Sequence, residues 1–404
     1  MKNIIVIGAG ASGMLAAITA AERGASVTVL EGMEKPGKKL LLTGSGRCNL
    51  TNLHQSEDCY RGDNRLIKSV LEQFSVDDTL KFFKKIGLLT YDRDGYVYPL
   101  TGQASSVLDV LLLEMRRLKV KLKCKEKVVS LEKDADGFHV RTESWTYHAD
   151  AVILATGSKA APATGSDGSG YTLAEMCGHL IHTPMEALVP LKIREPWIRK
   201  LSGIRMPAAI TLDCANTHKQ VYQEAGELQW TDYGISGIVV FQLSRYAVRA
   251  LREKQNVKVC LDLFSSFSEE ELYAHIKRRT CAETAGEMLA GVLPSKAIAP
   301  LLEQAGIAAS VKAATLSEEQ LHAIVKAIKH TELHVSGSKS FEQAQACQGG
   351  VDCTQMNRKT LESLIMEGLY ITGELLDVDG ICGGYNLQWA WSSGYAAGYH
   401  ASEG

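Results

Sequence analysis

The sequence has no run of about 18 uninterrupted apolar residues, the length that a membrane-spanning helix needs. The apolar residues near the N-terminus are interrupted by three glycines and end at Glu22-Arg23, which disfavours a signal peptide. The ten cysteines include no C-x-x-C pair, so neither a zinc site nor a disulfide framework is indicated. Such cysteine usage is typical of a reducing compartment. We therefore expect a cytoplasmic protein with no metal and no membrane partner.

The sequence also lacks an excess of charge of either sign. Lysine and arginine total 44, aspartate and glutamate total 46, and the formal net charge at pH 7 is −2. No dense run of basic residues occurs, so we expect no nucleic-acid partner. The nucleophile motif G-x-S-x-G is absent as well, which leaves an acyl-transfer hydrolase without support. The sequence leaves the oligomeric state open.

What the sequence does contain begins with a strand–turn–helix–strand pattern. Residues 4–7 are apolar and β-branched, as is typical of a parallel strand buried on both faces. Residues 12–23 are rich in alanine and predict a helix, and residues 26–30 predict a second strand. The turn between the first strand and the helix, GAGASG, fits the motif G-x-G-x-x-G. A βαβ unit with this turn indicates a dinucleotide-binding fold.

Each residue type in this turn suits a bound diphosphate. Gly8 permits the tight turn, Gly10 lets the backbone approach the diphosphate, and Gly13 lets the helix pack on the strand. The diphosphate is then expected at the positive end of the helix, beside Ser12. Glu31 ends the second strand and is expected to accept hydrogen bonds from the ribose hydroxyls, which disfavours NADP at this site. FAD and NAD share this motif, so other segments must decide between them.

Three later segments contain residues suited to a flavin. The loop at 44–52 has small residues, and within it Arg47 is suited to neutralise a phosphate or ring oxygen while Asn49 can donate a hydrogen bond. The segment 155–157 follows an apolar run, and its Thr-Gly end lets the chain pass close to a dinucleotide. The segment 370–386 combines a strand, a Gly-Glu pair suited to ribityl hydroxyls and the start of an apolar helix. Each segment is also compatible with an ordinary turn or strand–helix junction.

Cys48 lies inside the first of these loops. It is a candidate redox thiol or flavin attachment point, but no resolving cysteine lies nearby in the sequence. A packing role is the favoured interpretation.

These segments, in this order, resemble the flavoproteins with two dinucleotide-binding domains. The closer resemblance is to the group that contains the aminoacetone oxidases and the 3-dehydro-bile-acid reductases. The diagnostic stretches are GKKLL (37–41), GSGRCNLTN (44–52), TDYGISG (231–237), GGV (349–351), GELLDVDG (373–380) and GGYNLQ (383–388). The sequence departs from common patterns at Glu374, where flavoproteins generally have Asp, at Ile238, where the group often has Pro, and at residues 357–359.

The resemblance implies an α/β fold. We expect a Rossmann-like FAD-binding domain, split by an inserted β-barrel plus helical region. The first part is expected at residues 1–189, the inserted substrate or cap domain at 190–348, and the second part at 349–404. Within the insert, barrel strands are expected at 190–266 and 330–348, and helices at 267–329.

The motifs and the resemblance together give the expected FAD-binding residues. Val128 or Val129 is included by resemblance alone, as a backbone contact of the adenine. The full set is Gly8, Gly10, Ala11, Ser12, Gly13, Glu31, Lys38, Lys39, Gly46, Arg47, Cys48, Asn49, Val128, Val129, Ala155, Thr156, Gly157, Gly373, Glu374, Asp377, Gly384, Tyr385, Asn386 and Leu387. No catalytic acid or base can be named from the sequence.

The resemblance implies a FAD-dependent oxidoreductase. A hydride would move between flavin N5 and either NAD(P)H or a small organic substrate. The reaction could include reduction of the C=C bonds of steroid or bile-acid-like molecules. No second G-x-G-x-x-G follows a strand, so NAD(P)H is expected to bind only transiently. Three alternatives stay open: an amine oxidase of the aminoacetone type that uses oxygen, a flavin-binding protein without turnover, and a flavin-dependent nucleic-acid modifier. The net charge of −2 disfavours the last of these.

Overall fold

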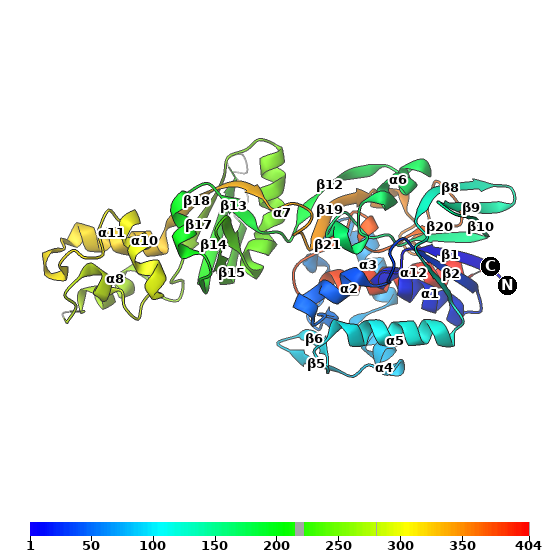
Figure 1. Ribbon diagram of the computed structural model, residues 1–404, viewed down its shortest axis with the longest axis horizontal. Helices are drawn as coiled ribbons and strands as arrows, with labels where there is room; N and C mark the ends of the chain where they lie inside the picture. The colour runs from blue at the N-terminus through cyan, green and yellow to red at the C-terminus, as the bar shows by residue number, and fades with distance from the viewer. Residues whose placement is uncertain (215–221, 280, 404) are drawn as a thin grey trace. The chain divides into compact units, whose positions relative to one another are not determined.

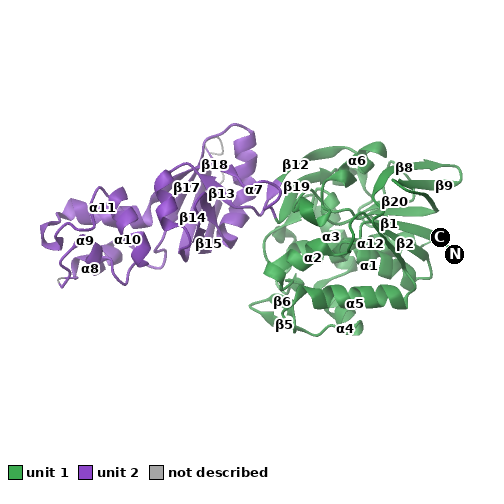
Figure 2. Ribbon diagram, viewed as in Figure 1, with its two compact units in different colours: residues 1–185, 345–404 green, residues 186–344 purple. Residues whose placement is uncertain are grey.

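The computed structural model describes residues 1–214, 222–279 and 281–403, which fold into two compact units (Figures 1 and 2). Unit 1 contains Met1–Met185 and Gln345–Gly404, and unit 2 contains Glu186–Ala344. The chain therefore leaves unit 1 once, builds unit 2, and returns to complete unit 1.

The centre of unit 1 is a five-stranded parallel sheet in the order β20-β11-β1-β2-β7. Its strands are Leu369–Ile371 (β20), Ala151–Leu154 (β11), Asn3–Ile7 (β1), Ser26–Glu31 (β2) and Lys121–Cys124 (β7). β1 pairs in parallel with both β11 and β2, and β11 with β20. The apolar residues of β1 and β11 are almost completely buried, as expected for central strands of a Rossmann-type sheet. The carboxyl ends of β1, β2, β11 and β20 consequently meet at one edge.

Two helices from opposite ends of the sequence pack together in unit 1: α1 (Ala11–Glu22) and α12 (Tyr385–Ala401) lie side by side (Figure 1). The contact is close because α12 contributes Gly394 and Gly398. A Cβ at Gly394 would overlap the carbonyl oxygen of Ser12, and one at Gly398 would overlap that of Ala16. The last helix of the chain is thereby fixed beside the first turn.

The other elements of unit 1 surround this centre. Its further helices are α2 (Lys38–Leu42), α3 (Asn64–Gln73), α4 (Val76–Lys85), α5 (Ala104–Arg117) and α6 (Ser169–Met176). Small sheets are formed by β3 (Thr51–Asn52), β6 (Tyr96–Pro99) and β5 (Thr90–Arg93); by β10 (Thr146–Ala149), β9 (Gly137–Thr142) and β8 (Val128–Asp134); by β21 (Asp379–Gly380) and β4 (Tyr60–Arg61); and by β12 (Ile181–Ala187) and β19 (Ala346–Val351).

Unit 2 contains a closed barrel in the order β13-β16-β15-β14-β17-β18. The strands are Leu191–Ile193 (β13), Gly234–Ser236 (β16), Tyr222–Trp230 (β15), Arg205–Cys214 (β14), Val257–Asp262 (β17) and Thr331–Ser338 (β18). The helices are α7 (Ile238–Arg252), α8 (Glu269–Lys277), α9 (Ala285–Met288), α10 (Ser295–Gln304) and α11 (Glu318–Lys329). Closing the sheet removes its exposed edges.

Helix α7 corrects part of the expectation that residues 190–266 form barrel strands. Its buried residues include Val239, Leu243 and Ala247, which recur at the spacing of one helical face. The β-branched residues and turn signals around it favour a strand locally, but burial of this face against the barrel stabilises the helix instead.

Among the described residues, no helix has both the length and the hydropathy that a bilayer crossing requires.

Candidate functional site

The glycine turn after β1 contains two packed glycines and one open one. Gly8 has φ +106°, and a Cβ there would lie 2.5 Å from the carbonyl oxygen of Ala155. A Cβ at Gly13 would overlap the carbonyl oxygen of Gly8. Gly10 differs, because no atom lies within 4 Å of a Cβ built on it. The space in front of Gly10, at the first turn of α1 where Ala11 and Ser12 follow, is therefore open to a ligand.

Glu31 lies at the end of β2, beside this turn. One of its carboxylate oxygens accepts a hydrogen bond from the backbone N–H of Ala9 at 2.8 Å, and the other from Met33 at 2.8 Å. Because each oxygen can accept more than one hydrogen bond, the carboxylate is held in place and can still accept from ribose hydroxyls.

The predicted adenine contacts are Val128 and Val129. They follow a segment that is hydrogen-bonded to Glu31. The backbone N–H of Glu126 donates to the carbonyl oxygen of Glu31 at 2.9 Å, which brings the start of β8 alongside β2. A β-bulge lies between Val128 and Ser130, so Val129 falls outside the regular ladder. The extra residue of a bulge leaves its ladder position unpaired. This is consistent with a backbone contact to a ligand, which stays a prediction.

The ends of β11 and β20 come together beside the first turn. Thr372 donates its backbone N–H to the carbonyl oxygen of Leu154 at 3.0 Å. A Cβ at Gly373 would lie 2.7 Å from the Ser12 hydroxyl oxygen, so this glycine touches the start of α1. The hydroxyls of Thr156 and Thr372 are buried and have no hydrogen-bond partner in the described part of the chain. Thr156, between Ala155 and Gly157, packs against Gly170.

Glu374 follows Gly373 and connects three segments. Its carboxylate forms an ion pair with Lys39 of α2, and the Ser158 hydroxyl donates to it at 3.0 Å. The side chains of Lys39 and Glu374 are 26% and 14% exposed. Partial burial keeps this pair less screened than a surface ion pair. Lys38 is partly buried next to Lys39.

The second glycine turn opens α12. Gly384 has φ +96°, and a Cβ there would lie 2.6 Å from the carbonyl oxygen of Thr51. The side-chain oxygen of Asn49 lies 2.9 Å from the same Cβ position, is buried, and has no hydrogen-bond partner among the described residues. The Tyr385 hydroxyl donates to the carbonyl oxygen of His54 at 3.1 Å, and Leu387 is partly buried. The turn and the loop at 44–52 therefore form one wall.

The Asn386 side chain does something that the sequence did not predict. Its amide oxygen accepts from the backbone N–H of Gly380 at 2.8 Å, and its amide nitrogen donates to the carbonyl oxygen of Gly380 at 2.9 Å. Both polar atoms thus close the chain's own turn. The expected contact of this residue with the cofactor stays a prediction.

Arg47 and Cys48 are neighbours with opposite environments. Arg47 is exposed and has no acidic partner among the residues described. Cys48 is completely buried, and burial raises the pKa of its thiol to about 12, which its hydrogen bond with Thr43 lowers only in part. A thiol with this pKa is not a nucleophile near neutral pH, so its environment favours packing. Gly46 beside Arg47 has φ +86° and open space around its Cβ position.

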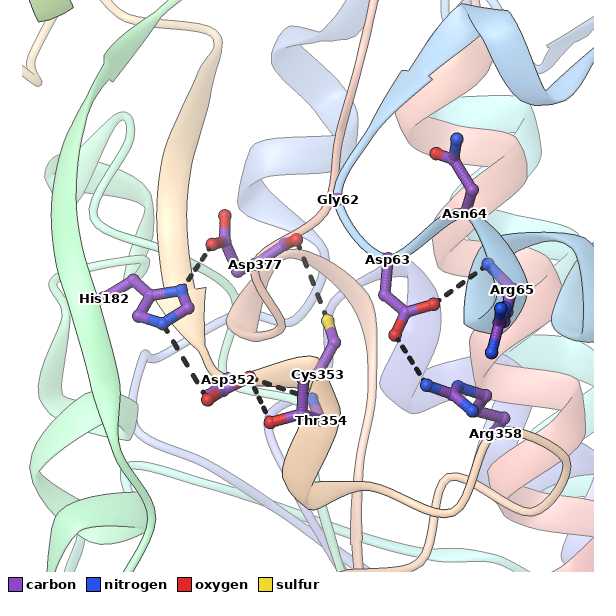
Figure 3. A pocket seen from close by; sticks show the side chains of 10 residues that line it. All are labelled: Gly62, Asp63, Asn64, Arg65, His182, Asp352, Cys353, Thr354, Arg358 and Asp377. Atoms are coloured by element: carbon purple, nitrogen blue, oxygen red, sulfur yellow. Dashed lines mark hydrogen bonds and ion pairs between the residues drawn. The ribbon is translucent and has the colours of Figure 1, made fainter.

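Asp377 faces a separate pocket of about 620 Å³ within unit 1 (Figure 3). Its carboxylate accepts from the backbone N–H of Gly349 at 2.9 Å and lies 2.8 Å from Nδ1 of His182. The other ring nitrogen of His182 lies 3.8 Å from Asp352. The Asp377 side chain therefore joins β12 to β19, and its expected contact with the cofactor stays a prediction.

Comparison with known proteins now adds to this geometry. A family model described as the HI0933-like protein Rossmann domain matches residues 2–400. The chain belongs to this family. It is 44% identical over 411 residues to the 3-dehydro-bile acid delta(4,6)-reductase of Clostridium scindens, with 100% of both chains covered. It is also 33% identical over 400 residues to the ribosomal RNA dihydrouridine synthase of Haemophilus influenzae, covering 97% of this chain and 96% of that protein.

Solved structures share the fold of this HI0933-like protein. A flavocytochrome c3 fumarate reductase matches with a TM-score of 0.53 and 15% identity, covering 99% of this chain and 78% of that one. The 3-ketosteroid delta1-dehydrogenase of Sterolibacterium denitrificans matches with a TM-score of 0.51 and 14% identity, covering 100% of both. The expectation of a Rossmann-type flavoprotein is confirmed. The chain is a FAD-dependent oxidoreductase.

The residues present fit FAD. The open space at Gly10 lies at a helix N-terminus, where a diphosphate is favoured. The side-chain oxygens of Thr372 and Asn49, which have no partner among residues 1–214, 222–279 and 281–403, are buried polar groups that a bound ligand could satisfy.

Sequence reasoning missed Ser158, which holds Glu374 by a hydrogen bond. A signal was present, because Ser158 directly follows Gly157 at the end of β11, but the contact depends on how β11 and β20 pair.

Proposed function

We propose that this oxidoreductase reduces a carbon–carbon double bond conjugated to a carbonyl group in a flat steroid or bile-acid-like molecule. NAD(P)H is the proposed electron donor and binds only transiently. The observation that carries the proposal is the 44% identity, over the full length of both chains, to a reductase that acts on a 3-dehydro-bile acid. An identity spread over both units supports a similar substrate site as well as a similar cofactor site.

The site supports this proposal through what its residues do around the cofactor. Bound FAD supplies the hydride chemistry. The first turn of α1 is proposed to bind the diphosphate at Gly10, and Glu31 to bind the ribose. Glu374, held by Lys39 and Ser158, is proposed to orient the ribityl chain. The N-terminus of α12 would place positive potential near the flavin ring.

A second candidate is reduction of uridine in RNA. Ribosomal RNA dihydrouridine synthases of Haemophilus influenzae and Escherichia coli are 33% and 30% identical to this chain. Dihydrouridine is uridine whose ring double bond has been reduced, so both candidates use the same kind of reaction. The net charge of −2 favours the small-molecule substrate, because RNA binding depends strongly on basic surface.

An anaerobic experiment with electron donors separates a reductase from an amine oxidase and from a flavin-binding protein without turnover. The purified yellow protein is mixed with NADH, NADPH or aminoacetone, and flavin absorbance is followed. We expect NAD(P)H to bleach the flavin. Bleaching by aminoacetone instead would identify an amine oxidase, and no bleaching by any donor would favour a flavin-binding protein without turnover.

The acceptor is then tested on the reduced protein. A 3-oxo-4-ene steroid, a uridine-rich ribosomal RNA fragment and oxygen are added separately. We expect the steroid to restore the yellow colour fastest and to gain two hydrogens by mass spectrometry. Faster reoxidation by the RNA, with dihydrouridine as product, would replace the steroid proposal with the second candidate.

A further inference from the structure

The hairpin of β5 and β6 presents an apolar and aromatic face. Directly opposed residues of antiparallel strands point to the same side, and here Tyr91 lies opposite Tyr98 and Arg93 opposite Tyr96. The rings of Tyr91 and Tyr98 have centroids 5.8 Å apart. Val97, between the two β6 tyrosines, points to the buried side. One face of the hairpin therefore carries three tyrosines and an arginine.

Two leucines extend this face. The backbone N–H of Leu100 donates to the carbonyl oxygen of Leu89 at 2.8 Å, which continues the pairing by one step. By the alternation of the strands, both side chains share the side of Tyr91 and Tyr98. Leu89 is 60% exposed, Leu100 59% and Tyr91 42%. From residue 89 to residue 93 the face is about 13 Å long. A contiguous exposed apolar face of this kind marks a binding surface more often than scattered apolar residues do.

One end of the face lies against the second glycine turn. A Cβ at Gly383 would lie 2.8 Å from the Tyr96 ring and 3.2 Å from the Tyr385 ring. The Asn52 side chain donates to the carbonyl oxygen of Gly383 at 3.0 Å, and Asn52 pairs with Tyr96 in the ladder. Tyr96 is thus part of the wall that we assign to the flavin end of the site, while the leucines lie at the far end of the hairpin.

Two arginines act on the aromatic face near its flavin end. Burial raises the pKa of the Tyr98 phenol, the neighbouring tyrosines add to this, and Arg47 and Arg93 partly oppose it, so both guanidinium groups act on this ring. Among the described residues Arg47 has no acidic partner. In the described part of the chain, the ion-pair partner of Arg93 is Asp94 at 3.9 Å, with side chains 81% and 87% exposed, and such an exposed pair contributes little. The hydroxyls of Tyr96 and Tyr98 add hydrogen-bond donors.

We propose that this face is the platform that binds the ring skeleton of the substrate, an inference that rests on the function proposed above. The carbonyl end of the substrate lies at Tyr96 and Arg47, and its apolar body lies along Tyr91 and Tyr98 toward Leu89 and Leu100. The ligand class is a flat molecule of several fused rings with a carbonyl oxygen at one end. A one-ring enone with its carbonyl oxygen at Tyr96 would reach neither Tyr91 nor the leucines.

The test uses Leu100→Ser and Tyr91→Ser in the FAD-loaded protein, with Leu113→Ser as matched control. Leu113 is 57% exposed on α5, so its substitution removes a similar apolar group from another surface. Equilibrium dialysis of a four-ring 3-oxo-4-ene steroid gives Kd for the oxidised protein, in the absence of turnover. Reduction of 2-cyclohexenone gives kcat/KM for a one-ring substrate, and the flavin spectrum and Tm check that each variant is folded and loaded.

We expect both hairpin variants to raise the steroid Kd roughly tenfold and to leave kcat/KM for cyclohexenone unchanged. Leu113→Ser should change neither. If the wild type binds and reduces the steroid but the hairpin variants bind it equally well, the platform is wrong and the proposed function stands. If the wild type neither binds nor reduces the steroid, the proposed function fails and this inference with it. If the hairpin variants bound single-stranded oligouridine more weakly than the wild type does, but bound the steroid equally well, the platform would also be wrong.

Discussion

The helices that begin at the candidate site start differently from two helices in unit 2. In unit 2, α8 begins with Ser268 and α11 with Ser317, and both have a capping box in which the serine hydroxyl accepts a backbone N–H of the first turn. In unit 1, α1 begins at Gly10 and α12 at Gly384. Among the residues described, no side chain caps the start of either helix by a hydrogen bond.

This difference has a physical meaning. The first turn of any helix has N–H groups without a partner in the helix, and a serine cap satisfies one of them. A serine cap contributes about 1 kcal/mol relative to alanine but only a few tenths of a kcal/mol relative to glycine, so a glycine start lowers the intrinsic stability of the helix slightly. At α1 and α12 the uncapped N–H groups remain free to bind an anion or an electron-rich ring. We infer that the two helices exchange a little local stability for ligand binding, and the substitutions below test this.

The largest effect is expected at the first glycine turn. Gly10→Val should leave a folded but colourless protein, because its φ of −82° suits any residue while the new side chain fills the space for the diphosphate. We expect FAD affinity to fall about 100-fold or more, measured by the ratio of flavin to protein absorbance and by FAD titration.

Gly13→Val is the contrasting variant in the same turn. Its Cβ would overlap the carbonyl oxygen of Gly8, so it should lower Tm strongly or prevent folding, measured by circular dichroism. Equal effects of the two variants on folding would contradict the distinction between an open and a packed glycine.

A smaller effect is expected at the ribose end. Glu31→Ala should lower FAD affinity about tenfold to 100-fold, because the carboxylate that would accept the ribose hydroxyls is lost. The N–H groups of Ala9 and Met33 lose their acceptor as well, so a modest fall in Tm should accompany it. Glu34→Ala is the control, because Glu34 is exposed and, within the ranges that the structure describes, pairs only with Lys125. An unchanged FAD affinity in Glu31→Ala would remove the ribose role.

These tests concern residues that the sequence could identify. The turn at Gly8–Gly13 and the carboxylate of Glu31 depend on a local strand–turn–helix–strand pattern, which periodicity and glycine spacing reveal without knowledge of distant contacts. Helix α7 shows the limit for the fold, because its β-branched residues favour strands locally and only burial against the barrel decides for the helix.

The later half of the site shows the same limit. The hydrogen bond from Ser158 to Glu374 joins residues 216 positions apart, and the Lys39–Glu374 pair joins residues 335 apart. Such contacts follow from the order of strands in the sheet, which single-sequence patterns do not give. The Asn386 side chain closes the turn at Gly380, a contact that the motif does not reveal, because a motif gives a residue's position but not the partner of its side chain. Its contact with the cofactor stays a prediction.

The smallest effect belongs to the capped helices. Ser317→Ala should lower the free energy of unfolding by about 1 kcal/mol, since the N–H of Gln320 loses its acceptor, while FAD affinity stays unchanged. Chemical denaturation measures the first quantity and FAD titration the second, and Ser317→Asp, which keeps an acceptor at the cap, should restore most of the stability. A loss of FAD in Ser317→Ala would mean that helix starts in unit 2 also affect the cofactor, and the division between stability caps and ligand-binding turns would then not hold.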